Sequence, residues 1–406
     1  MESVATATRS KTVTNEIFLI FLLASIQFTN IMDFMIMFPL QDYFLKQFHI
    51  NTAMFSLILS SYSFAAAIAA LVGANFIDRF NRKSAAIFLY SGFLIGTALC
   101  AVAHTYSFLL IARVIAGIFG GMMSGIVLSI IGDVFPIEKR GKAMGGVMGA
   151  FSAASVLGVP SGIRIAIHFG WNYTFGFIVA IGIPILAFAI LYLPSLPSKM
   201  EKTPIADFSQ LGKVLSDPAH LRALVFFMAV ILGGFTVVTS IAVYMERNMG
   251  FSKHDVSRIY EIGGICTFAS SWLVGFLSDK FGKHRIFMFL VLLAILPILS
   301  ITHLPQDLPV PLALVVTTFF MILVSGRVIP AMALMTSSIR PEIRGSFMSV
   351  NSSMQSVATG LGALLAGAIL VQLPNGTFER FDIVGYLAVG FNLLALYLSR
   401  KVKVVS

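Results

Sequence analysis

The sequence predicts an all-α polytopic membrane protein, with about twelve transmembrane helices in two pseudo-symmetric six-helix bundles. Hydrophobic residues make up 57% of the 406 residues and charged residues only 11%, whereas soluble domains carry about 25% charged residues. The mean hydropathy is +0.91. Apolar stretches of about 20 residues, enough to cross a bilayer, recur along the whole chain. Two short charged loops repeat about half a chain apart, which indicates a duplicated unit.

The apolar stretches give the approximate positions of the spans. We expect spans at residues 15–40, 54–77, 84–103, 107–131, 142–166, 171–193, 219–246, 255–277, 285–303, 309–338, 344–372 and 382–400. Several prolines interrupt the pattern after the sixth span, ahead of a short amphipathic stretch around Phe208, Leu211 and Val214. We therefore expect an N-terminal six-helix bundle, a cytoplasmic linker with an amphipathic helix on the inner leaflet and a C-terminal six-helix bundle, at residues 1–193, 194–218 and 219–406.

The net charge of +10 is distributed as a membrane topology signal. With the N-terminus inside, most Lys and Arg residues fall in the cytoplasmic loops, and the outer loops hold only Lys46, Arg247, Lys253, Arg258 and Arg380. We expect a multi-pass protein of the inner (cytoplasmic) membrane with both termini in the cytoplasm. The lipid bilayer, and not nucleic acid, is the partner that this charge pattern indicates, and we expect a monomer.

Motifs for enzymatic chemistry are missing from the sequence. It has no P-loop, no histidine pair at metal-ligand spacing and no hydrolase nucleophile elbow with its partners. The two cysteines, Cys100 and Cys266, lie in separate spans, where they are interpreted as small buried hydrophobic residues. We therefore expect no enzyme, no metal site and no cofactor.

Two pairs of matched loops carry the internal repeat. The acid-plus-basic clusters of the first pair are Asp78, Arg79, Arg82 and Lys83 in residues 74–83, and Asp279, Lys280, Lys283 and Arg285 in residues 275–285. The second pair, residues 136–144 and 340–348, precedes the fifth and eleventh spans. A single loop of this kind would be read as a solvated turn. Matched pairs indicate parallel repeats, which in secondary transporters rock around a midplane site.

The chain resembles the major facilitator superfamily of transporters from end to end. Its first charged loop resembles the superfamily's signature between the second and third spans, although Ala74 and Asn81 stand where glycines are usual. The second loop matches more closely. The resemblance implies that both loops are gating loops: Asp78 would face the start of the eleventh span near Gly345, and the second loop would make the equivalent contact near Gly141.

A finer resemblance is to the drug:proton antiporter branch, which includes arabinose-efflux-type permeases. It rests on residues 32–39 in the first span and on residues 154–175, with Gly158, Pro160 and Gly162 in the fifth span. In that branch the fifth-span motif is associated with export, although three glycines of its full consensus are replaced here. A proline beside glycines also marks a place where a helix bends.

Asp33 in the first span and Arg113 in the fourth span are charged residues inside the bilayer, where each costs about 2.5 to 3.5 kcal/mol. Counting about 1.5 Å per residue puts both at a similar depth in the outer half. In the superfamily these two spans are neighbours that line the cavity. An aspartate beside an arginine stays ionised, and separating the pair favours protonation. We expect Asp33 to carry the proton and Arg113 to set its proton affinity; the alternative is a static ion pair that fixes helix register.

Several more side chains are candidates for the substrate cavity: Asn30, Met37, Tyr62, Glu261, Arg327, Asn351 and Gln355. Arg327 in the tenth span has three candidate partners, which are Glu261, a backbone carbonyl and an anionic part of the substrate. We expect Arg327 to face the cavity and to favour anionic or hydrogen-bond-accepting compounds. Asn351 and Gln355 share one helical face, where either a wet cavity or a neighbouring helix would satisfy their amides.

Together these features predict a secondary active transporter that exports a small, amphipathic organic molecule in exchange for protons, by alternating access. A proton gradient is the expected energy source, and the small-molecule substrate and protons are the expected partners. A symporter, a uniporter or a lipid flippase on the same fold is the first alternative. A membrane receptor that no longer transports is the second.

Overall fold

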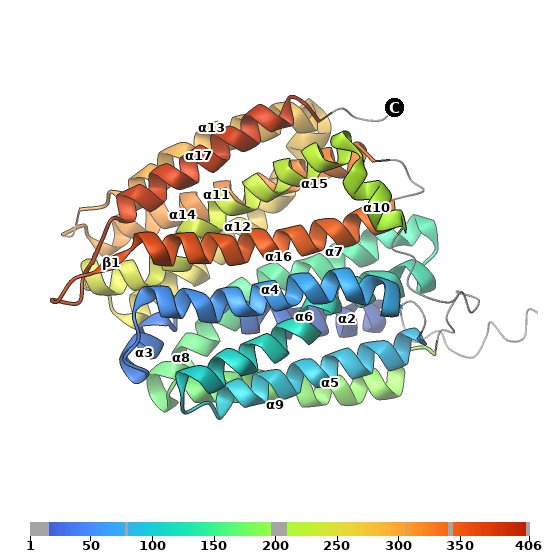
Figure 1. The fold of residues 1–406 in the computed structure, drawn as a ribbon, viewed down its shortest axis with the longest axis horizontal. Helices are drawn as coiled ribbons and strands as arrows, with labels where there is room; N and C mark the ends of the chain where they lie inside the picture. The colour runs from blue at the N-terminus through green and yellow to red at the C-terminus, as the bar shows by residue number, and fades with distance from the viewer. Residues whose placement is uncertain (1–15, 78–79, 196–208, 306, 340–343, 403–406) are drawn as a thin grey trace, which may run out of the picture.

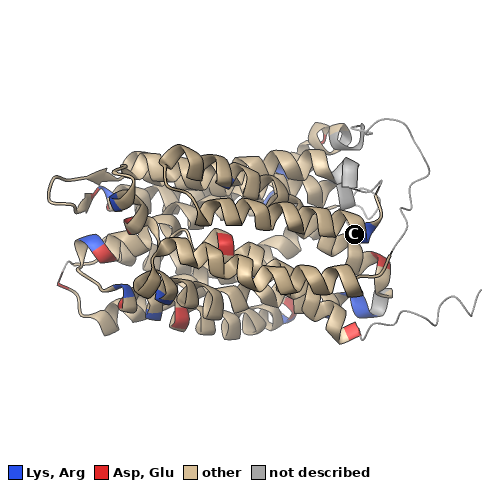
Figure 2. Cartoon of the chain, turned by 90° about the horizontal axis from the view of Figure 1, so that it is seen from below, with Lys and Arg blue, Asp and Glu red and all other residues tan. Residues whose placement is uncertain are grey.

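The computed structural model is a bundle of long helices lying side by side, described over residues 16–77, 80–195, 209–305, 307–339 and 344–402 (Figure 1). Within those residues, 11 helical stretches are long and apolar enough to cross a membrane. Lys, Arg, Asp and Glu gather at the two ends of the bundle and leave a broad, nearly uncharged band between them (Figure 2). The all-helical membrane architecture predicted from hydropathy is confirmed.

The helices before residue 196 form one layer of Figure 1, and those after residue 208 form the other. The first set is α2 (Glu16–Met35), α3 (Gln41–Gln47), α4 (Thr52–Ile77), α5 (Arg82–Ala101), α6 (Tyr106–Val134), α7 (Ile137–Ala153), η2 (Ala154–Gly158), α8 (Val159–Phe169) and α9 (Trp171–Tyr192). The second set is α10 (Ser209–Ser216), α11 (Pro218–Asn248), α12 (Lys253–Phe281), α13 (Lys283–Thr302), α14 (Val310–Gly326), α15 (Val328–Ser337), α16 (Arg344–Ile369), β1 (Val371–Gln372), β2 (Phe378–Glu379) and α17 (Phe381–Ser399).

The helix α16 is long enough to span a membrane but is not among the 11 apolar stretches. Its first half carries many polar side chains, namely Asn351, Ser352, Ser353, Gln355 and Ser356. It packs extensively along α4 and α11, so neighbouring helices cover much of its surface. Membrane helices use small and polar residues at such helix–helix contacts. We therefore retain α16 as the twelfth span that the sequence predicts.

The largest cluster of buried apolar residues joins the two sets of helices at one end, and α4 and α16 also pack against each other along their length. We call the end that holds the start of α2 the inner end, following the charge pattern of the loops. The largest apolar cluster lies mainly in the outer half and contains residues of both sets, such as Phe38 and Val237. Two further clusters lie towards the inner end, and the fully buried members of each come from one set. The two sets therefore share a core in the outer half and have separate cores in the inner half.

The two copies of the charged loop turn the chain in different ways. Gly282 links α12 to α13 with a φ of 94°, a left-handed conformation that suits glycine. Asn81 holds the matching position before α5 with a φ of −56°, and its side chain accepts a hydrogen bond from the backbone N–H of Lys83. An N-terminal cap of this kind stabilises a helix by about 1 kcal/mol. The asparagine that departs from the superfamily pattern is thus a helix cap.

The fifth span is irregular where its sequence motif lies. A π-helical turn, η2, separates α7 from α8, and Pro160 follows in the first turn of α8. The glycines bring this span against α2: a Cβ on Gly162 would lie 2.6 Å from Ile36, and one on Gly158 would lie 3.1 Å from Met32. Single π-helical turns inside membrane helices often mark functional positions.

The expected linker helix is present in part. The short helix α10 covers Ser209–Ser216, and its Val214 is fully buried in the apolar cluster of the second set. Phe208 lies outside the described residues, as does most of the proline-rich stretch before it. Val214 thus packs against protein, whereas the sequence predicted an inner-leaflet surface for this helix. The helix still bears Leu215 with 47% of its surface exposed.

Candidate functional site

Asp33 and Arg113 form an ion pair inside the bundle. The Arg113 guanidinium donates a hydrogen bond to Asp33 Oδ2 at 2.6 Å, and both side chains are 0% exposed. α2 carries Asp33 two residues before its outer end, and α6 carries Arg113 seven residues after its outer start, so depth counting along straight helices brings them together. The pairing inferred from the sequence is what the geometry shows.

Neighbouring helices hold this pair in a fixed geometry. The Thr97 hydroxyl on α5 donates to Asp33 Oδ1 at 3.1 Å, and the Arg113 guanidinium carbon stacks 4.3 Å from the centre of the Tyr62 ring on α4. Arg113 retains two buried nitrogens, Nε and Nη2, with no hydrogen-bond partner among the described residues. The aspartate has an acceptor site filled on each oxygen, whereas the guanidinium has unused donors.

A second polar contact lies on the inner side of this pair. Asn30 Nδ2 donates to the Tyr62 hydroxyl at 3.3 Å. A Cβ on Gly120 of α6 would lie 2.5 Å from that hydroxyl and 2.6 Å from Asn30 Nδ2. Asn30 is partly exposed and Tyr62 is 6% exposed. The glycine therefore leaves the room in which two predicted cavity residues meet, one helical turn inward from Asp33.

Arg327 lies between α14 and α15 and is 0% exposed. Its Nε donates to the Val324 carbonyl at 3.3 Å and its Nη2 to the Val230 carbonyl of α11 at 3.2 Å. Glu261 pairs instead with Arg164 of α8. Of the partners expected for Arg327, the backbone carbonyls are the ones present, and a Glu261–Arg327 contact is not formed.

The remaining predicted cavity residues lie at different depths. Met37 is fully buried beyond Asp33 within the shared outer core, Asn351 is 2% exposed and Gln355 is partly buried. Between Asn351 and Gln355, Ser353 donates to the Ala67 carbonyl of α4 at 2.8 Å. This contact joins the two sets of helices and was not anticipated from the sequence.

The gating loops are described in part. Asp78 and Arg79 lie outside the described residues, as do the surroundings of Gly345, so the expected contact between them is not described. Arg82 forms an ion pair with Asp133 at 3.0 Å, within the first set of helices. The loop geometry at Lys83 is the Asn81 cap given above.

In the second loop, Asp279, Lys280 and Arg285 are exposed, and Lys283 donates to the Ser337 hydroxyl at 3.0 Å. The expected partner region near Gly141 is open, because a Cβ built there meets nothing within 4 Å. The fifth span also packs on α12 mainly through η2 and α8 and only slightly through α7. Among the described residues, no hydrogen bond or ion pair joins this loop to the start of the fifth span.

An ionic cluster closes the outer end. Asp42 on α3 accepts hydrogen bonds from Arg247 Nε at 2.5 Å and lies 3.5 Å from Lys253 Nζ, and both cations belong to the second set of helices. Lys253 also pairs with Glu246 at 3.0 Å and stacks 3.9 Å over the Tyr43 ring. Among the described residues, every ion pair between the two sets lies at this outer end. We call these residues, Asp42, Tyr43, Glu246, Arg247 and Lys253, the outer cluster.

Neighbouring cations keep the Asp42 carboxyl ionised. Burial alone would raise the pKa of its carboxyl, but Lys46 at 2.9 Å, Lys253 and Arg247 together hold that pKa below its usual value. The sequence did offer a signal for the outer cluster, because Arg247 and Lys253 are among the few cations expected in outer loops. Which anion pairs with them depends on how the two sets of helices pack.

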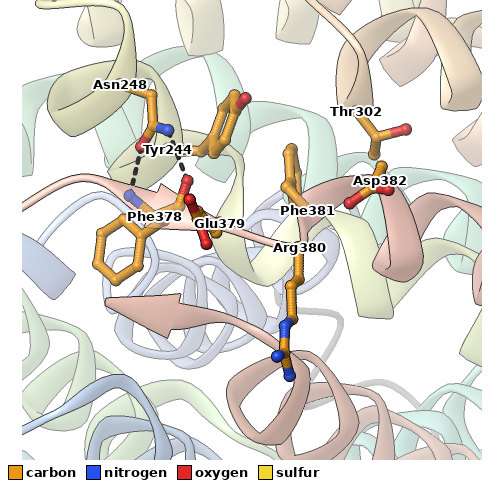
Figure 3. A pocket seen from close by; sticks show the side chains of 8 residues that line it. All are labelled: Tyr244, Asn248, Thr302, Phe378, Glu379, Arg380, Phe381 and Asp382. Carbon is orange, nitrogen blue, oxygen red and sulfur yellow. Dashed lines mark hydrogen bonds between the residues drawn. The ribbon is translucent and has the colours of Figure 1, made fainter. Parts of the chain in front are cut away.

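A separate hollow of about 360 Å³ opens on the outer face of the second set of helices. Figure 3 shows its lining residues: Tyr244, Asn248, Thr302, Phe378, Glu379, Arg380, Phe381 and Asp382. The Asn248 amide donates to the Phe378 carbonyl at 2.6 Å and accepts from its N–H at 2.9 Å, which ties the β1–β2 hairpin to α11. No residue of the Asp33 site lines this hollow, and we do not assign it to transport.

Comparison with known proteins gives a consistent family. A model described as Major Facilitator Superfamily matches residues 23–363. An uncharacterized MFS-type transporter, YtbD, of Bacillus subtilis (strain 168) is 27% identical over 83% of this chain and 84% of its own. Multidrug resistance protein 3 of the same strain is 32% identical over 58% of this chain and 41% of its own.

A solved structure has the same fold. It is titled as a bacterial homologue of the human lysosomal transporter Spinster, in an inward-facing and unoccupied conformation. It superposes with a TM-score of 0.78 at 17% identity and covers 96% of this chain and 97% of its own. At that identity the likeness concerns the fold alone. With a family model matching most of the chain and a twelve-helix fold that agrees, this protein is a member of the Major Facilitator Superfamily of transporters.

Proposed function

We propose that this protein exports a small, amphipathic organic molecule across the inner membrane in exchange for protons. The observation that carries the proposal is the Asp33–Arg113 pair, which is fully buried within the helices of the first set. Ionisable residues at such positions are rare and mark ion pathways. The similarity to a multidrug resistance protein supports export, and so does the resemblance of the fifth-span motif to that of the drug:proton antiporter branch.

Asp33 is the proposed proton carrier. Its carboxylate has one strong charged donor, Arg113, and one neutral donor, Thr97. A proton on Asp33 removes the charge that holds Arg113, and the guanidinium then turns its free donors to other acceptors. The Tyr62 ring keeps the cation in place through this step, because the cation–ring attraction does not depend on Asp33. Arg113 thus sets the proton affinity of Asp33.

The protonation state of Asp33 can affect the contacts that close the outer side, because α2 connects the two. Phe34 follows Asp33 directly, and its ring lies 6.2 Å from the ring of Phe235 on α11, while Phe38 lies 6.4 Å from the same ring. These aromatic contacts join the two sets of helices between the Asp33 site and the outer cluster. A shift of α2 on protonation would therefore loosen the closure on the outer side.

The transport cycle follows from these contacts. Protons reach Asp33 from outside when the outer cluster is separated, and substrate enters from the cytoplasm when it is closed. Substrate binding displaces the proton, and the loaded protein then opens outward. In this proposal both termini lie in the cytoplasm, residues 1–193 and 219–406 are the two bundles, and the gating loops hold the inner side closed in the outward-open state.

A symporter, uniporter or lipid flippase on the same fold is the competing proposal, and the sign of proton movement separates it from an exporter. A thermal-stability screen of the purified protein against antibiotics, sugars, siderophores and lysolipids first identifies a compound that binds. That compound is then added to proteoliposomes holding a pH-sensitive dye. Antiport moves protons in the direction opposite to the compound, symport moves them in the same direction, and uniport moves none.

A further inference from the structure

We propose that Arg327 binds an anionic oxygen of the transported molecule, so that the substrate is an organic acid. The proposal deepens the function proposed above and rests on it only in taking the substrate to enter from the inner side. It starts from a charge balance inside the bundle, where each half carries one fully buried arginine, Arg113 and Arg327.

The two arginines differ in how their charge is neutralised. Arg113 faces the carboxylate of Asp33. Arg327 forms no ion pair with any described residue, and Glu261, the carboxylate proposed from the sequence as its partner, pairs with Arg164 at the outer end. An arginine keeps its proton under all ordinary conditions. A cation buried without an anion is unfavourable, which makes an anion supplied by a ligand the natural partner.

The donors of Arg327 are only partly used. Two of its nitrogens donate to carbonyls at 3.2 and 3.3 Å, which are long for bonds from a charged donor. The third, Nη1, is buried and has no partner among the described residues. A guanidinium presents its donors as a planar fork that fits carboxylate and phosphate groups. The free nitrogen is therefore one arm of an anion site.

The surrounding backbone makes room for the guanidinium. Arg327 joins α14 to α15 with helical backbone angles, because its N–H donates to the Leu323 carbonyl at 3.2 Å and its carbonyl accepts from the Ala331 N–H at 3.2 Å. A Cβ on Gly234 of α11 would come within 3.2 Å of Arg327 Nη2 and 2.8 Å of a Val324 methyl group. A larger residue at position 234 would push the guanidinium aside. The missing side chain at Gly234 therefore leaves the space that the Arg327 guanidinium occupies against α11.

The depth of Arg327 favours access from the inner side. It lies 17 residues after the outer start of α14 and ten residues before the end of α15, and at about 1.5 Å per residue this is the inner half of the span. In that half the two sets of helices have separate apolar cores. Asp33 lies in the outer half of the bundle. A substrate molecule bound at Arg327 therefore does not cover Asp33, which can still gain or lose a proton when the conformation changes.

The test uses the full-length protein in detergent and three probes that share one aromatic body: benzoate, phenyl phosphate and uncharged benzamide. Melting temperature is measured at constant ionic strength set with potassium chloride. We expect benzoate, phenyl phosphate or both to raise the melting temperature by a few degrees with a saturable dose dependence, and benzamide to have no effect. Whichever anion gives the larger shift identifies the acid group as carboxylate or phosphate.

Three variants assign the effect to Arg327. Arg327→Gln removes the shift, Arg327→Lys retains part of it because the charge remains, and Arg222→Gln, which alters an exposed arginine on α11, leaves it unchanged. A merely structural arginine would make the ligand-free Arg327→Gln protein melt at a lower temperature, whereas an unpaired ligand-binding arginine leaves it the same or higher. The proposal is overturned if neither anion stabilises the wild type, or if the shift persists in Arg327→Gln.

The failure of this inference is distinguishable from failure of proton coupling. Asp33→Asn keeps Arg327 intact, so it retains the anion-induced shift in melting temperature even where proton-driven transport is lost. Loss of the shift in Asp33→Asn together with its persistence in Arg327→Gln would move the anion site to Arg113 and contradict the proposal.

Discussion

Replacing Asp42 by Asn should release the outer closure. The carboxylate accepts a 2.5 Å hydrogen bond from Arg247 and lies 3.5 Å from Lys253, both across the boundary between the two sets of helices. Hydrogen bonds to charged groups contribute about 1.5 to 3 kcal/mol, and the partner side chains here are 22% and 25% exposed, which reduces the gain through solvent screening. We expect about 2 kcal/mol in favour of the outward-open state, which is about 30-fold in its population.

Thiol labelling measures that population. In a background with Cys100 and Cys266 replaced by Ala, Met37→Cys provides a reporter that is fully buried in the closed outer core. The protein is placed in nanodiscs and the rate of reaction with a membrane-impermeant maleimide is recorded. Asp42→Asn should raise that rate about 30-fold. Asp255→Asn is the matched control, because the described partners of Asp255 are Ser252 and Arg258, both at its own end of α12.

The same assay has a defined pH dependence. The pKa of Asp42 is held below its usual value of 3.8 in the closed state, so its contribution to closure is complete above that value and is lost as the pH falls through the lowered pKa. In the wild type, the protonation of Asp42 should therefore not change the labelling rate between pH 6 and 8, because these values are well above 3.8. The rate should rise only in strong acid, where Asp42 becomes protonated. An unchanged rate in Asp42→Asn at neutral pH would refute the assignment of the outer cluster as a gate.

Two further predictions concern packing around the proton site. Gly117→Ala would bring a Cβ within 2.4 Å of the Tyr62 carbonyl oxygen, so we expect it to lower the free energy of unfolding by about 1 to 3 kcal/mol. Gly125→Ala is the control and should be tolerated, because a Cβ there meets nothing within 4 Å. Thermal melting of the two variants tests this difference. Tyr62→Phe removes the hydroxyl that accepts from Asn30 but keeps the ring over Arg113, so it should cost about 1 kcal/mol and leave proton coupling intact, as measured by melting and by proton flux.

Hydropathy predicts the membrane-spanning helices, and counting residues along them predicts the Asp33–Arg113 pair. Every long apolar stretch is a helix because a bilayer allows few other ways to satisfy the backbone. Asp33 and Arg113 could be paired from the sequence because helices rise by a constant amount per residue and the superfamily places their spans side by side. The proline and glycines of the fifth span likewise coincide with an irregular helix.

What escaped prediction depends on helix rotation and on contacts between distant segments. Asp42 meets Arg247 across 205 residues, and Ser353 meets Ala67 across 286 residues, and no local pattern encodes either contact. Glu261 was a candidate for Arg327 by chain position, yet it pairs with Arg164 near the outer end. The motif shows only that Asn81 stands in place of a glycine. Its role as the N-terminal cap of α5 follows from the local backbone angles, which the sequence does not give.

Proton-driven transport by Asp33→Asn tests the central claim most directly. The variant leaves Arg113 buried without its partner, a change that can cost about 3 to 5 kcal/mol, so Asp33→Asn/Arg113→Gln, which removes both charges, serves as the folding control. In proteoliposomes with a compound that binds the wild type, we predict that both variants exchange the compound across the membrane but no longer accumulate it in response to a pH gradient. Full proton-driven accumulation by folded Asp33→Asn would contradict the claim that Asp33 carries the proton.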